Sequence, residues 1–307
     1  MRLALLFSGQ GQQTPNHLHT LQSGAAAQSD ALLASLLPGV WRNPAVSGKT
    51  LQNNHIAQPF IFAFQMQYWQ RLKPLLPRPI CAAGYSLGEL AACAAAGIFD
   101  FKQGATLATQ RAACMDACVH SEAGLLAIMG LPLHELKSVI ASSNTHLAIS
   151  NPEQHYVIGG LELALQHAGK LAEERGAKRV VRLCVQTPSH TPLLRPATEV
   201  FEQHLLPYRS GPPMAFKVLS AIDGRATMDP QRALDALARQ ISSSMDWQAC
   251  LHAIQELQPD AVLEIGPGGA MARMWNAVYP NIPARSTDDF RSTEGIKMWV
   301  DQVHLAH

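Results

Sequence analysis

No run of apolar residues in this sequence is long enough to cross a membrane. The longest stretch, from about Ala91 to Phe99, falls well short of the roughly 20 residues that a membrane-spanning helix needs. The apolar start, Met1 to Phe7, is also too short for a secretory signal. Neither sign of charge is in large excess, because the formal net charge is only +1. Such a charge gives no general attraction to nucleic acid or to anionic lipid. The sequence therefore predicts a cytoplasmic protein with neither a membrane nor a nucleic-acid partner.

Paired cysteine spacing is absent as well. The chain has six cysteines in 307 residues, mostly inside apolar segments, which predicts buried, reduced thiols rather than a disulfide framework. Cys114, Cys118 and His120 are close in the sequence, but no second pair of ligands follows them. We therefore expect no bound metal.

The sequence does contain ample apolar material for a core, with 47% hydrophobic and 15% charged residues. Its length suits one large domain or two unequal ones. Between residues 124 and 185 the pattern reads strand, helix, strand, strand, helix, strand, which is the order of a ferredoxin-like unit. We predict an α/β fold. Residues 1–122 and 188–307 would form an α/β-hydrolase-like large domain with a parallel-sheet core, and residues 123–187 an inserted small ferredoxin-like subdomain.

A serine lies between a short apolar run and an Ala-rich segment. The sequence Gly84-Tyr85-Ser86-Leu87-Gly88 fits Gly-x-Ser-x-Gly, and a strand before it with a helix after it is the setting of a nucleophile elbow. The helix N-terminus would stabilise an oxyanion there, in part through the N–H of Leu87. The alternative is a tight turn in which Ser86 only caps the helix.

A serine nucleophile needs a base, and histidine is the usual one near neutral pH. His190 is the best candidate, because Pro188 and Pro192 stiffen its loop just after a predicted strand. Spacing alone does not identify a third member, which leaves three aspartates open: Asp223, Asp246 and Asp260.

Two glycine-containing loops follow predicted strands. The loop at residues 8–13 lacks the third glycine of a dinucleotide fingerprint, because Thr14 stands at that position. The Gly-Pro-Gly-Gly loop at residues 266–269 could cradle a phosphate, although such a sequence after a strand is more often only a turn.

Five short motifs occur in order along the chain. They are Phe-Ser-Gly-Gln-Gly-Gln-Gln at 7–13, Gly-Tyr-Ser-Leu-Gly-Glu at 84–89, Gln-Arg at 110–111, Pro-Ser-His at 188–190 and Glu-Ile-Gly-Pro-Gly at 264–268. Together they resemble the malonyl-CoA:acyl-carrier-protein transacylase family, which includes the acyltransferase domains of polyketide and fatty-acid synthases. The resemblance covers nearly the whole chain. It implies an acyltransferase without a bound cofactor that takes malonyl-CoA as substrate and an acyl-carrier protein's prosthetic thiol as acceptor.

The resemblance also implies a role for individual residues. Ser86 would be the acylated nucleophile and His190 its base, oriented by a backbone carbonyl that we expect within residues 243–246. Gln10 and Leu87 would supply the backbone N–H donors of the oxyanion hole. Arg111 would bind the malonyl carboxylate through two hydrogen bonds, since a guanidinium fork matches a carboxylate. From the residues alone, a surface arginine that snorkels to solvent is the alternative for Arg111.

Two positions depart from that family's usual pattern. Tyr85 stands where histidine is usual, and Ser8 where proline is usual. Tyr85 replaces neither catalytic residue, so we expect the chemistry to survive and the range of substrates to be affected.

The C-terminal segment narrows the expectation further. Residues 284–296 resemble the ending of the malonate decarboxylase epsilon subunit, which passes malonyl from CoA to the decarboxylase's own carrier-protein subunit. On this local resemblance we favour that subunit over a transacylase of fatty-acid or polyketide synthesis. The alternative is that the segment only caps a helix.

Two other classes of function fit the same residues. A serine esterase or thioesterase would share the elbow but use water as acceptor, and a non-catalytic assembly subunit would keep only the fold. For a carrier partner, a basic stretch offers a docking patch for an acidic protein, although a solvated helix face is the usual explanation. Its residues are Lys170, Arg175, Lys178, Arg179 and Arg182.

Overall fold

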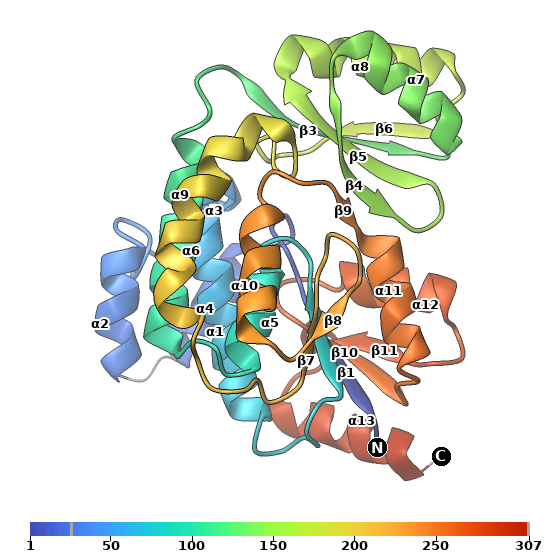
Figure 1. The fold of residues 1–307 in the computed structure, drawn as a ribbon. Helices are drawn as coiled ribbons and strands as arrows, with labels where there is room; N and C mark the ends of the chain where they lie inside the picture. The colour runs from blue at the N-terminus through green and yellow to red at the C-terminus, as the bar shows by residue number, and fades with distance from the viewer. Residues whose placement is uncertain (25–26, 306–307) are drawn as a thin grey trace.

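The computed structural model describes residues 1–24 and 27–305, which fold around two β-sheets (Figure 1). The smaller sheet lies at the top of the view, and the larger sheet lies in the body of the molecule below it. Within the described residues, no helix is both long and apolar enough to span a bilayer.

The larger sheet is built from strands that are distant in the sequence. In chain order these are β1 (Leu3–Phe7), β2 (Cys81–Gly84), β7 (Lys217–Leu219), β8 (Ala226–Thr227), β10 (Ala261–Ile265) and β11 (Ala284–Ser286). Their order in the sheet is β11-β10-β1-β2-β7-β8. Neighbours pair in parallel except that β8 runs antiparallel to β7. The predicted α/β class with a parallel-sheet core is confirmed, with a short antiparallel edge in addition.

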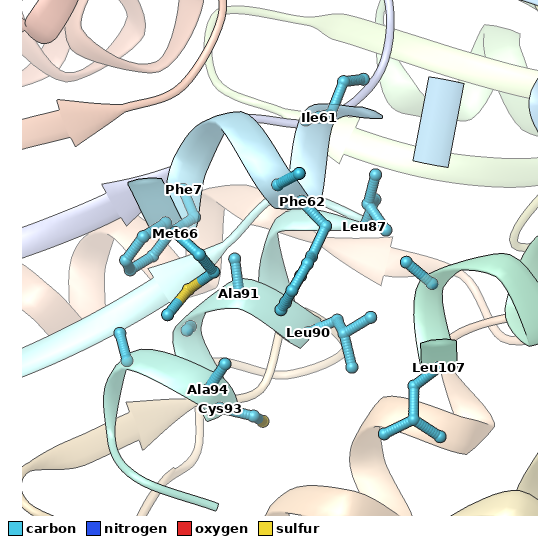
Figure 2. Packing of buried hydrophobic residues seen from close by; sticks show 14 of the residues in the cluster. Phe7, Ile61, Phe62, Met66, Leu87, Leu90, Ala91, Cys93, Ala94 and Leu107 are labelled. Carbon is cyan, nitrogen blue, oxygen red and sulfur yellow. The ribbon is translucent and has the colours of Figure 1, made fainter. Parts of the chain in front are cut away.

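Strand β1 shows why helices must cover both faces of this sheet. All five of its residues are buried, and side chains alternate between the two faces of a strand. Leu3, Leu5 and Phe7 belong to one hydrophobic cluster, while Ala4 and Leu6 belong to another. Figure 2 shows Phe7 among apolar side chains of the first cluster.

The larger sheet is accompanied by most of the helices. Helices α4 (Asn54–Leu72), α5 (Gly88–Ala95) and α6 (Phe101–Asp116) contribute side chains to the first hydrophobic cluster, and α4 is buried along most of its length. On the opposite face lie α11 (Trp247–Glu256) and α12 (Ala270–Val278). The remaining helices are α1 (Pro15–Ser23), α2 (Ala27–Leu36), α3 (Gly48–Gln52), α9 (Arg195–Leu205), α10 (Pro230–Arg239) and α13 (Thr293–Leu305), with short 3₁₀ turns η1 (Pro192–Leu194), η2 (Leu206–Tyr208) and η3 (Thr287–Asp289).

The smaller sheet follows the predicted element order. Its elements are β3 (Ala123–Met129), α7 (Leu133–Ser143), β4 (His146–Asn151), β5 (His155–Leu161), α8 (Glu162–Glu174) and β6 (Arg179–Arg182). The strands lie in the order β6-β3-β5-β4, and a fifth strand, β9 (Met245–Asp246), pairs in parallel with β4. Because β9 comes from a later part of the chain, the sheet is not made by residues 123–187 alone.

The two sheets share a hydrophobic core. Leu126 and Ile128 of β3 pack in the small region's own cluster, whereas Leu125 and Ala127 point the other way. Those two residues join the cluster that also contains Trp247 and one face of the larger sheet. This shared core fixes the smaller sheet against the larger one.

Candidate active site

The serine turn joins β2 to α5, and there is no room for a side chain at the two glycines that flank it, Gly84 and Gly88. Ser86 has a φ of +54°, a backbone conformation that residues other than glycine seldom adopt. A Cβ placed on Gly84 would lie 1.9 Å from the backbone of Gly88, and one on Gly88 would lie 2.0 Å from the carbonyl oxygen of Phe7. The two glycines therefore allow the close approach of strand and helix that presents the serine at the end of β2.

The loop at residues 8–13 lies beside this turn. Phe7 pairs with Gly84 in the parallel register of β1 and β2, so both strands end at the same edge of the sheet. A Cβ on Gly9 would approach the Tyr85 carbonyl oxygen to 2.7 Å. The backbone N–H groups of Gln10 and Leu87 donate no hydrogen bond within the described residues. The Gln10 side chain is anchored, since Nε2 donates to the carbonyl oxygen of Gln52 at 2.8 Å.

His190 meets Ser86 from a different part of the chain. Its Nε2 lies 2.8 Å from Ser86 Oγ, and its Nδ1 lies 2.5 Å from the carbonyl oxygen of Gln240. The backbone here is also left-handed, with a φ of +63°, and the side chain is buried. Burial, with the nearby charge of Arg111, lowers the pKa of His190 to about 3, so the imidazole is neutral and Nε2 can accept a proton.

The expected position of the orienting carbonyl is wrong. That carbonyl belongs to Gln240, before the predicted segment of residues 243–246. The chain leaves α10 just ahead of Gln240, and His190 N–H donates to the Ile241 carbonyl oxygen at 2.8 Å, so the two segments pair locally. The segment expected to hold the carbonyl instead enters β9 and the smaller sheet.

The three aspartates left open as triad members are engaged elsewhere. Asp246 accepts a hydrogen bond from Ala249 N and caps α11. Asp223 accepts from the backbone N–H of Arg225 and pairs with its side chain. Asp260 accepts from the backbone N–H of Arg2. A backbone carbonyl therefore occupies the place that a carboxylate holds in a Ser-His-Asp triad.

Arg111 reaches the site from α6, and its side chain is only 1% exposed. This burial rules out the snorkelling alternative. Helices α4 and α6 pack closely, since a Cβ on Gly104 would lie 2.1 Å from the Phe62 ring. The Arg111 Nη1 donates to Gln58 Oε1 on α4 at 2.9 Å, and Nη2 approaches Gln240 Oε1 at 3.4 Å. Burial lowers the pKa of Arg111 to about 10, so the side chain still carries its charge at neutral pH.

Sequence reasoning missed Gln58, Gln240 and Glu89. Glu89 is 1% exposed, and its Oε2 accepts from Ala221 N at 2.9 Å and from Gln240 Nε2 at 3.0 Å. Burial raises the pKa of Glu89 to about 8. The sequence did carry a signal, since Glu89 is the single charged residue of an Ala-rich helix and Gln58 lies in an apolar one. Nothing in the sequence pointed to Gln240.

Tyr85 connects the serine turn to the smaller sheet. Its hydroxyl donates to Asn151 Oδ1 on β4 at 3.3 Å, and its ring meets the Trp247 ring edge to face at 5.2 Å. The tyrosine side chain therefore points toward the smaller sheet, while the Ser86 hydroxyl meets His190.

A cleft of about 850 Å³ lies beside Gln10. It runs between α3 and the segment after β6. Its lining includes Lys49, Gln52, Asn54, His55, Asp116, Cys184, Gln186 and Thr187.

The loop at residues 266–269 forms a turn that is held by side chains of the protein itself. At the 266–269 loop, Gly268 N donates to Asp288 Oδ2 and Gly269 N donates to Gln12 Oε1. These N–H groups are occupied by the protein's own acceptors, so the structure favours a turn over a phosphate site. Among the described residues, no group of three His, Cys, Asp or Glu side chains is placed to hold a metal ion.

Comparison with known proteins extends this geometry to a family. The model for "Acyl transferase domain" matches residues 6–283. A malonyl CoA-acyl carrier protein transacylase from Mycobacterium bovis is 30% identical, over 92% of this chain and 95% of its own. An acyl carrier protein S-malonyltransferase structure from Vibrio cholerae is 28% identical with a TM-score of 0.85, covering 96% of this chain and 100% of its own.

A further solved structure contains a carrier. It is a type II PKS acyl-carrier protein in complex with its malonyl-transacylase, 25% identical to this chain with a TM-score of 0.84, covering 96% of this chain and 98% of its own. These full-length similarities agree with the family match and with the geometry around Ser86. The chain therefore belongs to the acyl transferase domain family, and the protein is an acyltransferase.

Proposed function

We propose that this protein is an S-malonyltransferase that moves malonyl from malonyl-CoA through Ser86 to the thiol of an acyl-carrier protein. The observation that carries the proposal is the 2.8 Å contact between Ser86 Oγ and His190 Nε2 on a nucleophile elbow, with a buried arginine nearby. The names of the full-length relatives support the choice of donor and acceptor.

Ser86 and His190 would carry both halves of the transfer. The Ser86 oxygen attacks the thioester carbonyl while His190 Nε2 takes the hydroxyl proton. The C–S bond then breaks, and the CoA thiolate leaves with that proton. In the second half the carrier thiol gives its proton to His190 and attacks the Ser86 ester, which restores the serine hydroxyl. The N–H groups of Gln10 and Leu87 would stabilise the oxyanion in each half.

Arg111 would select the acyl group. Its guanidinium is buried and charged, and its Nε has no hydrogen-bond partner within the described residues. A malonyl carboxylate matches such a fork, whereas an acetyl group leaves it unpaired. The arginine therefore favours an acyl group that ends in a carboxylate.

For the acceptor, the comparisons favour a transacylase of fatty-acid or polyketide synthesis over the malonate decarboxylase epsilon subunit. The relatives reported above are named for transfer to an acyl carrier protein and match over nearly their full length. The decarboxylase interpretation rests on residues 284–296 alone. Much of that segment has a local structural role, since Ser286 caps η3 and Arg285 stacks on Phe290 at 4.0 Å.

Discharge of the labelled enzyme tests this proposal. The protein is loaded with labelled malonyl-CoA, freed of CoA, and divided among an ordinary acyl-carrier protein, a decarboxylase-type carrier and buffer. We expect the ordinary carrier to discharge it fastest. Discharge by the decarboxylase-type carrier alone would restore the epsilon-subunit interpretation. Equally fast loss in buffer would indicate an esterase or thioesterase, and no labelling would indicate a non-catalytic subunit.

A further inference from the structure

Among the described residues, both hydrogen-bond partners of the Arg111 guanidinium are neutral amides. Gln58 Oε1 accepts from Nη1 and Gln240 Oε1 from Nη2, and both glutamines are buried. Buried cations are normally paired directly with carboxylates, because an uncompensated charge in the interior is costly. Here the protein holds the guanidinium plane in place without neutralising it.

Each amide is held so that its oxygen faces the arginine. Gln58 Nε2 donates to Asn54 Oδ1 at 2.8 Å. Gln240 Nε2 donates to the Ser86 carbonyl oxygen and to Glu89 Oε2, both at 3.0 Å. Because the amide nitrogens are committed to these acceptors, the carbonyl ends point to Arg111.

The nearest carboxylates lie one step further along these two relays. Asn54 Nδ2 donates to Asp116 Oδ1 at 2.8 Å, and Glu89 stands behind Gln240. A carboxylate in direct contact with Arg111 would occupy its fork and repel a second carboxylate. The intervening amides avoid both effects, and among residues 1–24 and 27–305 Arg111 Nε has no hydrogen-bond partner.

We propose that Gln58 and Gln240 are specificity-determining residues that orient Arg111 and keep its charge available for the free carboxylate of the acyl group. The inference rests on the proposed malonyl transfer, and it adds a reason why the arginine prefers malonyl. The incoming carboxylate becomes the only direct counter-charge of the guanidinium. An acetyl group supplies none.

The test is Gln58→Glu, which keeps the shape of the side chain and places a carboxylate against Arg111. The measured quantity is kcat/KM for acylation by malonyl-CoA and by acetyl-CoA. We expect the malonyl value to fall about tenfold or more, because the fork is already neutralised, and the acetyl value to change little. A folded Gln58→Glu enzyme that keeps the wild-type preference for malonyl would overturn the inference.

The matched control is Gln67→Glu on the same helix. Gln67 is also buried, but its Nε2 donates to the Leu21 carbonyl oxygen, away from Arg111. We expect this variant to keep the wild-type malonyl-to-acetyl ratio. An equal loss of preference in Gln67→Glu would assign the effect to a buried charge anywhere on α4 and refute the inference.

A second variant covers the case in which Gln58→Glu does not fold. Gln58→Met removes the acceptor without adding charge, so Arg111 loses orientation but keeps its charge. We expect KM for malonyl-CoA to rise several-fold with a smaller change in kcat, and the acetyl-CoA constants to stay near wild type. An unchanged malonyl KM would count against the inference.

Arg111→Ala separates this inference from the proposed function. If Arg111→Ala loses the malonyl preference while folded Gln58→Glu keeps it, the amide relay fails and the malonyl transferase stands. If wild-type enzyme accepts no malonyl, the proposed function itself fails. If Arg111→Ala keeps the preference, Arg111 does not bind the carboxylate and the inference fails, while transfer through Ser86 stands.

Discussion

Two partly or fully buried arginines in this protein are treated in opposite ways. Arg182, at the end of β6, donates through Nη1 to the carbonyl oxygens of Leu125 and Leu183 at 2.9 and 2.8 Å. It also pairs with Glu162 Oε2 at 2.9 Å. In the part of the chain that the structure describes, Arg111 has only amide partners and an unpartnered Nε. The first arginine is committed to structural contacts, whereas the second keeps an unpartnered donor, as the proposed binding of a carboxylate requires.

The carboxyl groups associated with the two arginines, Glu162 and Glu89, have pKa values shifted in opposite directions. Glu162 touches Arg182, and hydrogen bonds from that arginine lower the pKa of Glu162. Glu89 is separated from Arg111 by Gln240, and burial raises its pKa to about 8. Contact with Arg182 thus favours the charged form of Glu162, whereas burial favours the neutral form of Glu89.

The largest expected effect comes from removing the free arginine. In Arg111→Ala we expect the preference for malonyl-CoA over acetyl-CoA to fall about a hundredfold or more, since a buried charged contact is lost. Acylation rates from the two thioesters measure it, and the melting temperature shows whether the fold survives. Unchanged selectivity would remove Arg111 from the site.

The matching change at the committed arginine should affect stability instead. Arg182→Ala leaves several carbonyl oxygens and Glu162 without their donor, so we expect a loss of about 2 kcal/mol in the free energy of unfolding. Denaturant unfolding measures the loss, and the malonyl-to-acetyl ratio should stay at its wild-type value. A changed ratio with intact stability would contradict the contrast between the two arginines.

The same contrast reduces the number of residues in the basic stretch that are available to a carrier protein. Arg182 is committed to structure and Arg175 pairs with Glu135 at 2.9 Å, which leaves Lys170, Lys178 and Arg179 exposed. Lys178→Glu with Arg179→Glu should raise KM for an acidic carrier several-fold and leave acylation by malonyl-CoA unchanged.

Charge reversal at a distant pair provides the control for that prediction. Lys73 and Lys102 are also exposed, and Lys73→Glu with Lys102→Glu makes the same change in net charge. If both double variants raise the carrier KM equally, the effect is one of overall charge and the docking patch is wrong.

The last prediction concerns Glu89, the carboxyl group behind the amide of Gln240. The folded protein holds a proton on Glu89 up to about pH 8, while the unfolded chain releases it near pH 4.5. Stability must therefore fall as pH rises between those values. Glu89→Gln removes this contribution, so its stability relative to wild type should increase from pH 5 to pH 8, as measured by urea unfolding at each pH. A constant difference would show that Glu89 is not held protonated.

The sequence predicted the parts of the site that lie within local motifs. The apolar runs predict the strands before the elbow and before the loop at residues 8–13. The glycines that follow each run predict the two turns. Gln240 was beyond reach because both its carbonyl and its amide act through segments far away in the chain, His190 and Arg111. β9 was missed for a similar reason, since two residues carry no periodic pattern and pair only because β4 is already in place.

The sequence also did not show which basic residues of this stretch are paired and which are free. In the sequence they form one basic stretch, and only the carbonyl oxygens of Leu125 and Leu183 show that Arg182 is committed. Charge is readable from sequence, but the number of free donors on a guanidinium depends on tertiary contacts.

Mass spectrometry of the enzyme after brief exposure to malonyl-CoA tests the central claim most directly. We predict a mass increase of one malonyl group, found on the peptide that contains Ser86 and absent from the Ser86→Ala variant. An adduct on another residue, or carrier loading by Ser86→Ala at the wild-type rate, would contradict the account.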